Sequence, residues 1–550
     1  MKNIYIALMF SSILVFFSSC HDILEEDTRS QISDNYLYSE LGFEAGLNAA
    51  YAFTRVVYCS QETPGYLTET GTDLWTHGTG GDQSWAYYNA NLRSTNGWND
   101  RSWREPYQAI NALNAVIERA PVVADISEDL KNIRVGEAKF LRALFYFHLV
   151  RQWGPVHLTL EETQGVEREA FRSPRADVYE AIINDLNAAI QALPNVASDY
   201  GRATKPAAEH LLALVHLTRA GFEDSAQPND YNNAAQLAKN VINNYNFRLL
   251  DDFADVFEFD ADRHAEVVWA VQNSKDIMLA GFGGNYTHAM FLPRYEQLPG
   301  MQRSMELGRA WSRHMPTSYA FNDLWDRQYD DRADKTLSRV FYSNQPGSFT
   351  STNGHAIQLA LGDTAAYFPT EVWSAEKISN AGYSVINPGQ WSRVIYPRIL
   401  KFTDPARVDD MDMRGSRDFI VMRLAETYLI AAEALMMMNE LDEAATYVNV
   451  VRSRAAKKGA TEAETEANRL AMQIAPNQLS VDFILEERGR ELMGEMMRRH
   501  DLVRTGKLLE RVHNYNPDAS AQIQPFHVLR PIPQNQIDRS TTDFGQNEGY

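Results

Sequence analysis

The fold is decided by the stretch VMRLAETYLIAAEALMMMNELDEAATYVNVVRSR, residues 421–454. Apolar and small side chains recur in it at steps of three and four, which is the pattern of amphipathic helices. A short polar break after Met438 separates two such stripes, so we expect antiparallel helices over about 418–438 and 442–455. Small residues on both stripes are typical of a tetratricopeptide-like hairpin. Because one hairpin cannot bury its own apolar face, others should exist.

The same helical period recurs through the first half of the chain, where strand signals are few and short. The order of the segments suggests that 103–119 pairs with 130–153 and that 176–193 pairs with 206–221. We therefore expect a mainly α protein with a tetratricopeptide-like helix-hairpin scaffold, too irregular in period for a regular solenoid. Helices are predicted over about 43–58, 103–119, 130–153, 176–193, 206–221 and 231–245.

Two stretches break the helical pattern. Glycines and prolines interrupt every periodic run between 273 and 414, which predicts a loop-rich insertion with few short strands. The insertion would divide the scaffold into 42–272 and 415–550. The stretch 63–100 has the same loop character and holds several tryptophans and tyrosines among glycines, asparagines and threonines. Irregular stretches of this length inside a compact protein are usually functional.

The amino terminus has the pattern of an export signal. An apolar run from Ile4 to Phe17 follows Lys2, falls short of the ~20 residues that span a bilayer, and ends in small residues before Cys20. This predicts a signal peptide over 1–19 and an acidic tether over 20–41. Cleavage would leave Cys59 as the second cysteine of the mature chain, so the sequence contains no disulfide framework and no cysteine metal site.

Charge and motifs bound the class of function. Lysine and arginine total 52 against 72 acidic residues, a net charge of −20, which argues against nucleic acid and against binding anionic lipid by charge. The glycines at 281–284 lack the strand and helix of a phosphate-binding loop. Asp260 and Asp262 alternate as calcium ligands can, but the required glycine and distal glutamate are missing. We expect no cofactor and no metal.

The charged motif EERGRELMGEMMRRHDLVR at 486–504 has the look of an acid–base cluster. On a helix, Glu486 with Arg490 and Glu495 with Arg499 lie four residues apart, so we interpret them as exposed ion pairs that each contribute a few tenths of a kcal/mol. No nucleophile elbow and no histidine pair at zinc spacing occurs. A carboxylate pair at glycosidase distance would count only in a cleft with a raised pKa. The sequence therefore does not predict an enzyme.

Five separated stretches resemble the SusD/RagB-like family of outer-membrane nutrient-binding lipoproteins. They are the start with Cys20, GEAKFLRA at 136–143 with WGP at 153–155, the hairpin at 423–454, ERGREL at 487–492 with RHDLVR at 499–504, and PIP at 531–533 with the terminal QNEGY. The resemblance implies a tetratricopeptide-like scaffold with a loop-rich face. It also implies binding without catalysis and partnership with a SusC-like TonB-dependent transporter.

The start of the chain resembles a bacterial lipoprotein signal in particular. In such a signal the thiol of Cys20 receives a diacylglyceryl group, and acyl chains anchor the protein at about 0.8 kcal/mol per buried methylene. The acidic residues after Cys20 resemble the signal that sends lipoproteins to the outer face in Bacteroides-like bacteria. The resemblance implies an outer-membrane protein, lipid-anchored and facing the cell exterior; a soluble periplasmic or secreted protein is the alternative.

The aromatic residues of the loops predict a ligand-binding face. A sugar ring stacks its C–H groups on an indole or phenol ring, while its hydroxyls need amide and carboxylate partners. We expect Trp75 and Trp311 to meet on one exposed face, whereas Trp103, Trp153 and Trp269 have the context of core residues. The candidate ligand-binding residues are Asp73, Trp75, Trp85, Tyr88, Trp98, Asn99, Tyr286, Tyr295 and Trp311.

These observations predict a cell-surface lipoprotein that captures an oligosaccharide or polysaccharide and delivers it to the transporter. The alternative is a peptide-binding uptake lipoprotein of the RagB type, which a deep neutral cavity would favour. A helical scaffold protein would instead need a large exposed apolar groove on its repeats. The sequence names neither the sugar nor the affinity.

Overall fold

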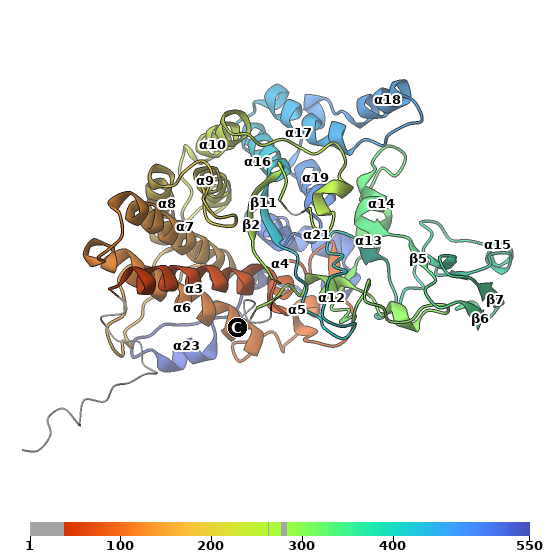
Figure 1. Cartoon of the computed structure of the whole chain (residues 1–550), viewed down its shortest axis with the longest axis horizontal. Helices are drawn as coiled ribbons and strands as arrows, with labels where there is room; N and C mark the ends of the chain where they lie inside the picture. Colours follow the sequence, from red (N-terminus) through yellow and green to blue (C-terminus); the bar gives the residue numbers. More distant parts are fainter. Residues whose placement is uncertain (1–37, 262, 275, 277–282) are drawn as a thin grey trace, which may run out of the picture.

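The computed structural model describes residues 38–261, 263–274, 276 and 283–550. The signal peptide, Cys20, most of the tether and Asp262 lie outside these ranges. Helices dominate, and the strands are short and belong to small sheets (Figure 1). Within the described ranges, no helix is both long and apolar enough to cross a membrane.

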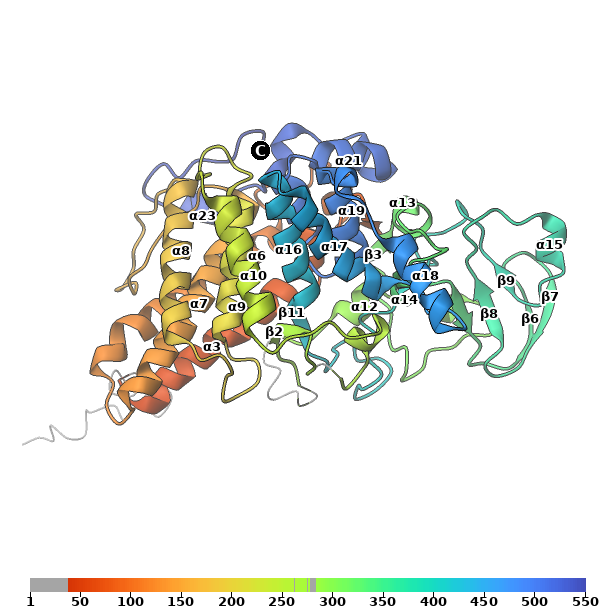
Figure 2. The same cartoon turned by 90° about the horizontal axis from the view of Figure 1, so that it is seen from above.

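The scaffold is a row of helices that pack on one another in sequence order. Each predicted pair is formed: α6 packs on α7, α8 on α9 and α16 on α17. The row continues from α10 to α16, although the whole insertion separates these two helices in the chain (Figure 2). The helices are α3 Glu40–Tyr58, α6 Gly97–Arg119, α7 Glu128–Trp153, α8 Arg175–Ala192, α9 Lys205–Arg219, α10 Asp230–Asn244, α16 Leu424–Met437 and α17 Leu441–Ala455.

Side-chain caps fix where several of these helices begin. Ser127 accepts a hydrogen bond from the Leu130 N–H at 3.3 Å and so caps α7. Thr204 caps α9, and Pro206 lies in the first turn of that helix, where its missing N–H costs nothing. These local signals explain why the predicted bounds lie within a few residues of the observed ones for most helices.

One predicted helix begins as a strand. Residues Phe419–Arg423 form β11, which pairs antiparallel with β2 (Val267–Val271), and α16 starts only at Leu424. The prediction of a helix from 418 was wrong because the backbone groups of this apolar segment find their partners in β2, a strand far away in the chain. The pair β2–β11 thus connects the two halves of the scaffold.

Short elements build the insertion and the stretch 63–100. The three-stranded sheet β5-β8-β9 and the hairpin β6–β7 lie at the end of the molecule farthest from α8 (Figures 1 and 2). The elements are α4 Thr63–Thr68, β1 Trp75–His77, α5 Ser84–Tyr87, α12 Thr287–Phe291, β3 His314–Pro316, α13 Ser318–Asn322, α14 Arg332–Thr336, β4 Leu337–Ser338, β5 Val340–Tyr342, β6 Gly347–Thr350, β7 Ala356–Leu359, β8 Thr364–Tyr367, α15 Ala375–Ser379, β9 Ser384–Val385 and β10 Arg398–Ile399.

The pair β1–β3 brings the two loop regions together. Trp75 lies opposite Pro316 and His77 opposite His314, so residues more than 200 positions apart become neighbours.

Helices of the carboxyl-terminal part complete the molecule: α18 Glu462–Met472, α19 Val481–Leu492, α20 Arg498–Arg504, α21 Leu508–Tyr515, α22 Pro517–Ser520 and α23 Gln534–Arg539.

The charged motif faces the interior, so its interpretation as a row of exposed ion pairs was wrong. Glu486 does lie 3.7 Å from Arg490. Glu495 instead pairs with Lys401 of the insertion, at 2.6 Å, and Arg499 is fully buried and donates to backbone carbonyls. Both α14 and α16 pack on α19 and exclude water from it. The spacing of charges along one helix does not reveal such covering by other elements.

Glu491 lies at the centre of this buried network. Its carboxylate accepts from Arg423 Nη1 at 2.6 Å and from Arg332 Nη1 at 2.8 Å, and it also pairs with Arg454. Burial would raise the pKa of Glu491, but the three guanidinium groups hold it well below its usual range. The network therefore ties the insertion, β11 and α17 to α19.

Candidate functional site

Tyr286 and Trp311 lie side by side at the surface of the insertion. Their ring centroids are 5.8 Å apart and their planes are inclined by 33°. Both side chains are half-buried. The Tyr286 N–H donates to the Cys59 carbonyl and the Trp311 N–H donates to the Ala289 carbonyl, each at 2.8 Å. The backbone of the pair is therefore fixed by Cys59 at the end of α3 and by α12, while both residues remain partly exposed.

Arg313 borders the pair on one side. Its Cζ lies 5.1 Å from the Trp311 ring centroid, within the range of a cation–π contact. Its Nε pairs with Glu62 Oε1 at 3.1 Å, and its Nη1 donates to the carbonyls of Thr79 and Trp311 at 2.8 and 2.9 Å. These contacts hold the guanidinium group in one position at the rim.

Amide and cationic groups border the pair on the other side. Gln61 makes a hydrogen bond with the Tyr286 hydroxyl and accepts one from Arg101 Nη1 at 2.7 Å. Burial raises the pKa of Tyr286, and Arg414 and Gln61 offset part of the increase. The hydroxyl therefore stays protonated at neutral pH and can donate a hydrogen bond to a ligand.

Glycines allow the loop after β1 to lie directly against this rim. A Cβ on Gly78 would stand 2.0 Å from the Ser312 carbonyl oxygen. Gly81 has a φ of +66°, and a Cβ there would stand 2.1 Å from the Tyr66 hydroxyl and 2.9 Å from Arg313 Cδ. Glycine is therefore required in the loop after β1, because its backbone lies too close to neighbouring residues to leave room for a side chain.

A polar cavity of about 540 Å³ begins at the same loop. Trp98 follows its last lining residue and is half-buried, with its ring 6.4 Å from that of Tyr66 in an edge contact. Trp98 is thus a partly exposed aromatic residue that directly follows the lining of this cavity in the chain. The cavity is lined mainly by hydrogen-bonding side chains, among them Asp82, Gln83, Asn89, Asn91, Arg93 and Asn96.

The arrangement combines apolar ring faces with amide, hydroxyl and guanidinium groups. This is the chemistry that holds a polyhydroxylated ring, whose C–H face stacks while its hydroxyls bond at the edge. Among the residues that the structure describes, no group of three or more histidine, cysteine or acidic side chains could hold a metal ion.

Most of the predicted ligand residues lie in the core instead. Trp75 is 0% exposed and packs edge-to-face on Phe291, with centroids 4.7 Å apart. Trp85 is also 0% exposed and stacks on Tyr66 at 6.0 Å. The expectation that Trp75 and Trp311 share an exposed face is wrong, because strand pairing carries Trp75 inward.

Asp73 is a structural residue as well. Its two carboxylate oxygens accept from Arg498 at 2.8 and 2.6 Å, and one of them also accepts from Arg511 at 2.7 Å. Burial would raise the pKa of Asp73, but the two guanidinium groups lower it below its ordinary value. This carboxylate joins the stretch before β1 to α20 and α21.

Three further predicted residues are buried, and their side chains donate hydrogen bonds to backbone carbonyl groups. Tyr88 donates to the Gly71 carbonyl at 3.0 Å, and Tyr295 donates to the Gly308 carbonyl at 2.8 Å. Asn99 donates to the Pro531 carbonyl at 2.7 Å. Trp103, Trp153 and Trp269 are buried, as predicted.

Four rim residues were not predicted: Gln61, Arg101, Arg313 and Arg414. Arg313 was accessible to sequence reasoning, because it follows Trp311 by two residues in the same loop. The other three reach the rim from α3–α4, from α6 and from the end of the insertion. No spacing in the sequence brings these segments together.

Two family profiles match this chain. One, described as "SusD family", matches residues 265–550, and the other, described as "Starch-binding associating with outer membrane", matches residues 28–217. Two similar curated proteins come from Formosa agariphila. SusD-like protein P25 is 27% identical over 79% of this chain and 76% of its own length, and SusD-like protein P2 is 26% identical over 99% of each.

Solved structures share the fold over most of the chain. A "Laminarin binding SusD-like protein" has a TM-score of 0.69 at 23% identity and covers 93% of this chain and 100% of its own. "Surface glycan-binding protein A from Bacteroides fluxus" has a TM-score of 0.66 at 20% identity and covers 93% and 99%. At these identities the likeness concerns the fold alone.

Proposed function

Because the chain belongs to the SusD family, we propose that it captures an oligosaccharide or polysaccharide on the Tyr286–Trp311 pair and passes it to a transporter. The single observation that carries the proposal is this half-buried aromatic pair, which is partly exposed and has fixed hydrogen-bonding groups beside it. Rings that a core does not enclose are exposed at a cost in free energy, and a ligand that stacks on them offsets that cost.

The chemistry of the rim favours a glycan over a peptide. Tyr286, Gln61 and Arg313 present single donors and acceptors around two ring faces, which suits separate hydroxyl groups. A bound peptide would need a row of backbone partners, such as an exposed strand edge. The family description that names starch, and the similar structures described as laminarin-binding and glycan-binding, support the same class of ligand.

The proposal includes an outer-membrane location and a protein partner. The description of the profile that matches residues 28–217 supports association with the outer membrane. The cysteine at position 20 supports a lipid anchor there, with the body facing the cell exterior. The partner is a SusC-like TonB-dependent transporter, and this chain would bind sugar without cleaving it.

Calorimetry with Trp311→Ala tests the binding site. After screening laminarin, starch and other polysaccharides by affinity electrophoresis, the best ligand should bind with a Kd between micromolar and millimolar. Loss of one stacked ring should weaken binding about five- to tenfold, since a stack contributes on the order of 1 kcal/mol beyond buried area. The melting temperature should stay within a few degrees, because the ring is half-buried.

Trp373→Ala is the matched control. This tryptophan is also half-buried, but it lies beside Tyr367 in the distal part of the insertion, with ring centroids 5.2 Å apart. Its replacement should leave affinity at the pair unchanged. An unchanged affinity in Trp311→Ala, or binding of peptides but of no glycan, would contradict the proposal.

A further inference from the structure

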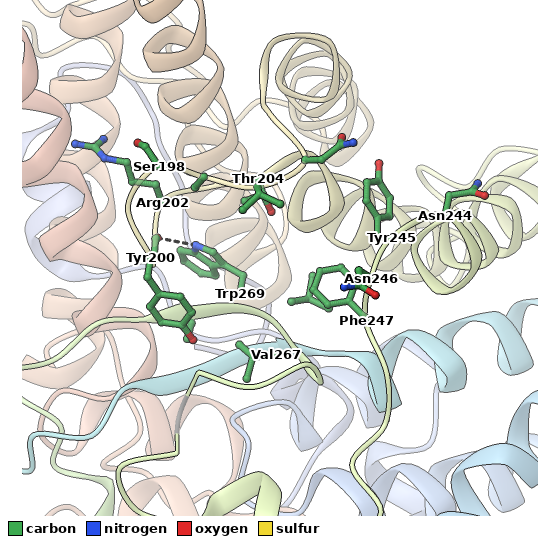
Figure 3. Close-up of a pocket in the computed structure, with 16 residues that line it drawn as sticks. Ser198, Tyr200, Arg202, Thr204, Asn244, Tyr245, Asn246, Phe247, Val267 and Trp269 are labelled. Carbon is green, nitrogen blue, oxygen red and sulfur yellow. Dashed lines mark hydrogen bonds between the residues drawn. The ribbon is translucent and has the colours of Figure 1, made fainter.

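A second cavity, of about 680 Å³, opens between the α8–α9 connection, the end of α10 and β2 (Figure 3). Its volume lies within the about 300–1,000 Å³ typical of small-molecule sites. None of the candidate ligand residues lines it. The sequence pattern did not indicate it, because its walls come from three segments that are each unremarkable alone.

Aromatic side chains from all three segments form the walls. Tyr200 and Phe247 are half-buried and lie on opposite sides of Val267, with Trp269 between them at the back (Figure 3). Tyr245, just after α10, is a further lining residue. Trp269 is 3% exposed, so little of its indole is accessible from the cavity. The walls therefore offer apolar ring surface from more than one direction.

The rim of the cavity is polar but neutral. Asn195 and Asn246 line it, and within the described residues neither side chain makes a hydrogen bond. Arg202 is the charged lining residue, and its guanidinium group is bound to Glu137 at 2.8 Å and to Glu44 at 3.2 Å. Arg263 does not line the cavity but lies over the Tyr200 ring, with its Cζ 4.5 Å from the ring centroid. The lining residues suit a ligand with many hydroxyl or amide groups.

The cavity is held open by contacts in its walls. Trp269 Nε1 donates to the Gly201 carbonyl at 3.0 Å, and Gln272 Nε2 donates to the Tyr200 carbonyl. Gly201 has a φ of +89°, and a Cβ there would stand 2.6 Å from the Gln272 side chain. The Trp269 ring and the Tyr200 backbone are thus fixed before a ligand arrives, which lowers the entropic cost of binding.

Helix α3 contacts a lining residue of this cavity, because its Glu44 pairs with Arg202 at 3.2 Å, and the end of α3 lies beside Tyr286. The Gln272 carbonyl accepts from Arg55 Nε of α3 at 2.9 Å, and the Tyr286 N–H donates to the carbonyl of Cys59, the residue that follows α3. A long chain held at one place would meet the other at a raised effective concentration.

We propose that this cavity is a second carbohydrate subsite, which takes a neutral hexose or N-acetylhexosamine ring between Tyr200 and Phe247. Asn195 and Asn246 supply the hydrogen bonds at its edge. The ligand class rests on the proposed function of the chain, while the site itself rests on the cavity and its neutral aromatic walls. The subsite lets one polysaccharide chain contact the protein at two separate places.

Fluorine NMR separates the two sites. Tryptophan is replaced throughout by 5-fluorotryptophan, and the resonances of Trp269 and Trp311 are assigned from Trp269→Phe and Trp311→Phe. Titration with laminarihexaose, maltohexaose and chitohexaose should shift both resonances. Phe247→Ala should raise the Kd read from Trp269 about fivefold, the loss expected for one stacked ring, and leave the Trp311 titration unchanged.

Asn246→Leu provides a second variant, because this exposed side chain is not needed for folding. It should weaken the Trp269 titration two- to fivefold at an unchanged melting temperature. Movement of Trp311 alone would overturn the subsite and leave the proposed function intact, whereas movement of neither resonance with any glycan would count against both. A Trp269 shift with trialanine but with no sugar would also overturn the carbohydrate assignment.

Discussion

At the scale of single residues, Glu69 is an acid with an unusual environment. It is fully buried, and its Oε1 accepts the backbone N–H groups of Met497 at 2.9 Å and Arg498 at 3.4 Å. Burial raises the pKa of Glu69 from 4.5 to about 8, although these two hydrogen bonds oppose the increase. The folded protein therefore holds this carboxyl group protonated at neutral pH.

Glu69 should make the protein less stable as the pH rises. In the unfolded chain the carboxyl group loses its proton near pH 4.5, and in the folded protein it does so only near pH 8. The free energy of unfolding therefore falls between these two pH values, by on the order of 5 kcal/mol from this group. Glu69→Gln should remove that part of the slope in urea unfolding at pH 5, 6.5 and 8. A variant with the slope of the wild type would contradict the raised pKa.

At the scale of elements, buried ion pairs connect α19 to segments that lie far from it in the sequence. Arg423 at the end of β11 contacts Glu491 at 2.6 Å, Glu495 at 2.7 Å and Glu266 at 3.1 Å. A buried pair is not in itself strong evidence for stability, because desolvation offsets the attraction. Removing one partner is costly, since the others are left buried and uncompensated.

Arg423→Met should lower the free energy of unfolding by about 3–5 kcal/mol, because three carboxylates lose a shared partner. Arg469→Met is the control. Arg469 also pairs with two acids, at 2.9 and 3.3 Å, but its side chain is 39% exposed, so the change should stay within about 1 kcal/mol. Urea unfolding at pH 7 measures both. Equal losses in the two variants would show that burial does not decide the effect.

The loop after β1 gives an element-scale prediction about binding. Gly81→Ala would place a side chain on a residue with a φ of +66°, which disfavours alanine. Its Cβ would stand 2.1 Å from the Tyr66 hydroxyl and 2.9 Å from Arg313 Cδ, so the loop must move away from Arg313. Glycan affinity should fall at least threefold, together with a loss of stability of about 1–3 kcal/mol. Gly362→Ala has a similar φ of +84° but nothing within 4 Å, so it should show backbone strain without loss of affinity. Calorimetry that finds equal affinities in both variants would refute the role of the loop.

At the scale of the whole molecule, the predicted anchor decides where the protein acts. Cys20→Ala should release it from the outer membrane into the soluble fraction, because no acyl chain could then be attached. Fractionation and immunoblotting after a high-salt wash, in cells that lack the transporter, measure this. A variant that still sediments with the membrane would contradict lipid anchoring.

The transporter partnership predicts a large interface. A face of this chain that closes over the mouth of a barrel should bury more than ~1,000 Å² and survive mild detergent. Affinity purification of a tagged copy from native membranes should therefore recover a TonB-dependent receptor. Repeated recovery of the tagged chain without any barrel protein would count against delivery to such a partner.

The sequence alone determined the helical scaffold. Period, caps and short connections are local properties, so the pairs 103–119 with 130–153 and 176–193 with 206–221 followed from neighbouring residues. The same local reasoning failed at β11, because a strand needs a partner and its partner β2 lies far away in the chain. The loop-rich insertion followed from glycine and proline content, although its strand pairs did not.

Only the tertiary structure decided which aromatic and charged residues face solvent. Trp75 and Trp311 both stand among loop-forming residues, yet the pairing of β1 with β3 buries the first and leaves part of the second exposed. Glu487 and Glu491 have the spacing of a solvated helix face, yet α19 is covered by segments from 60 to 160 residues away. Burial is a property of the surroundings of a side chain, and contacts between distant segments create those surroundings.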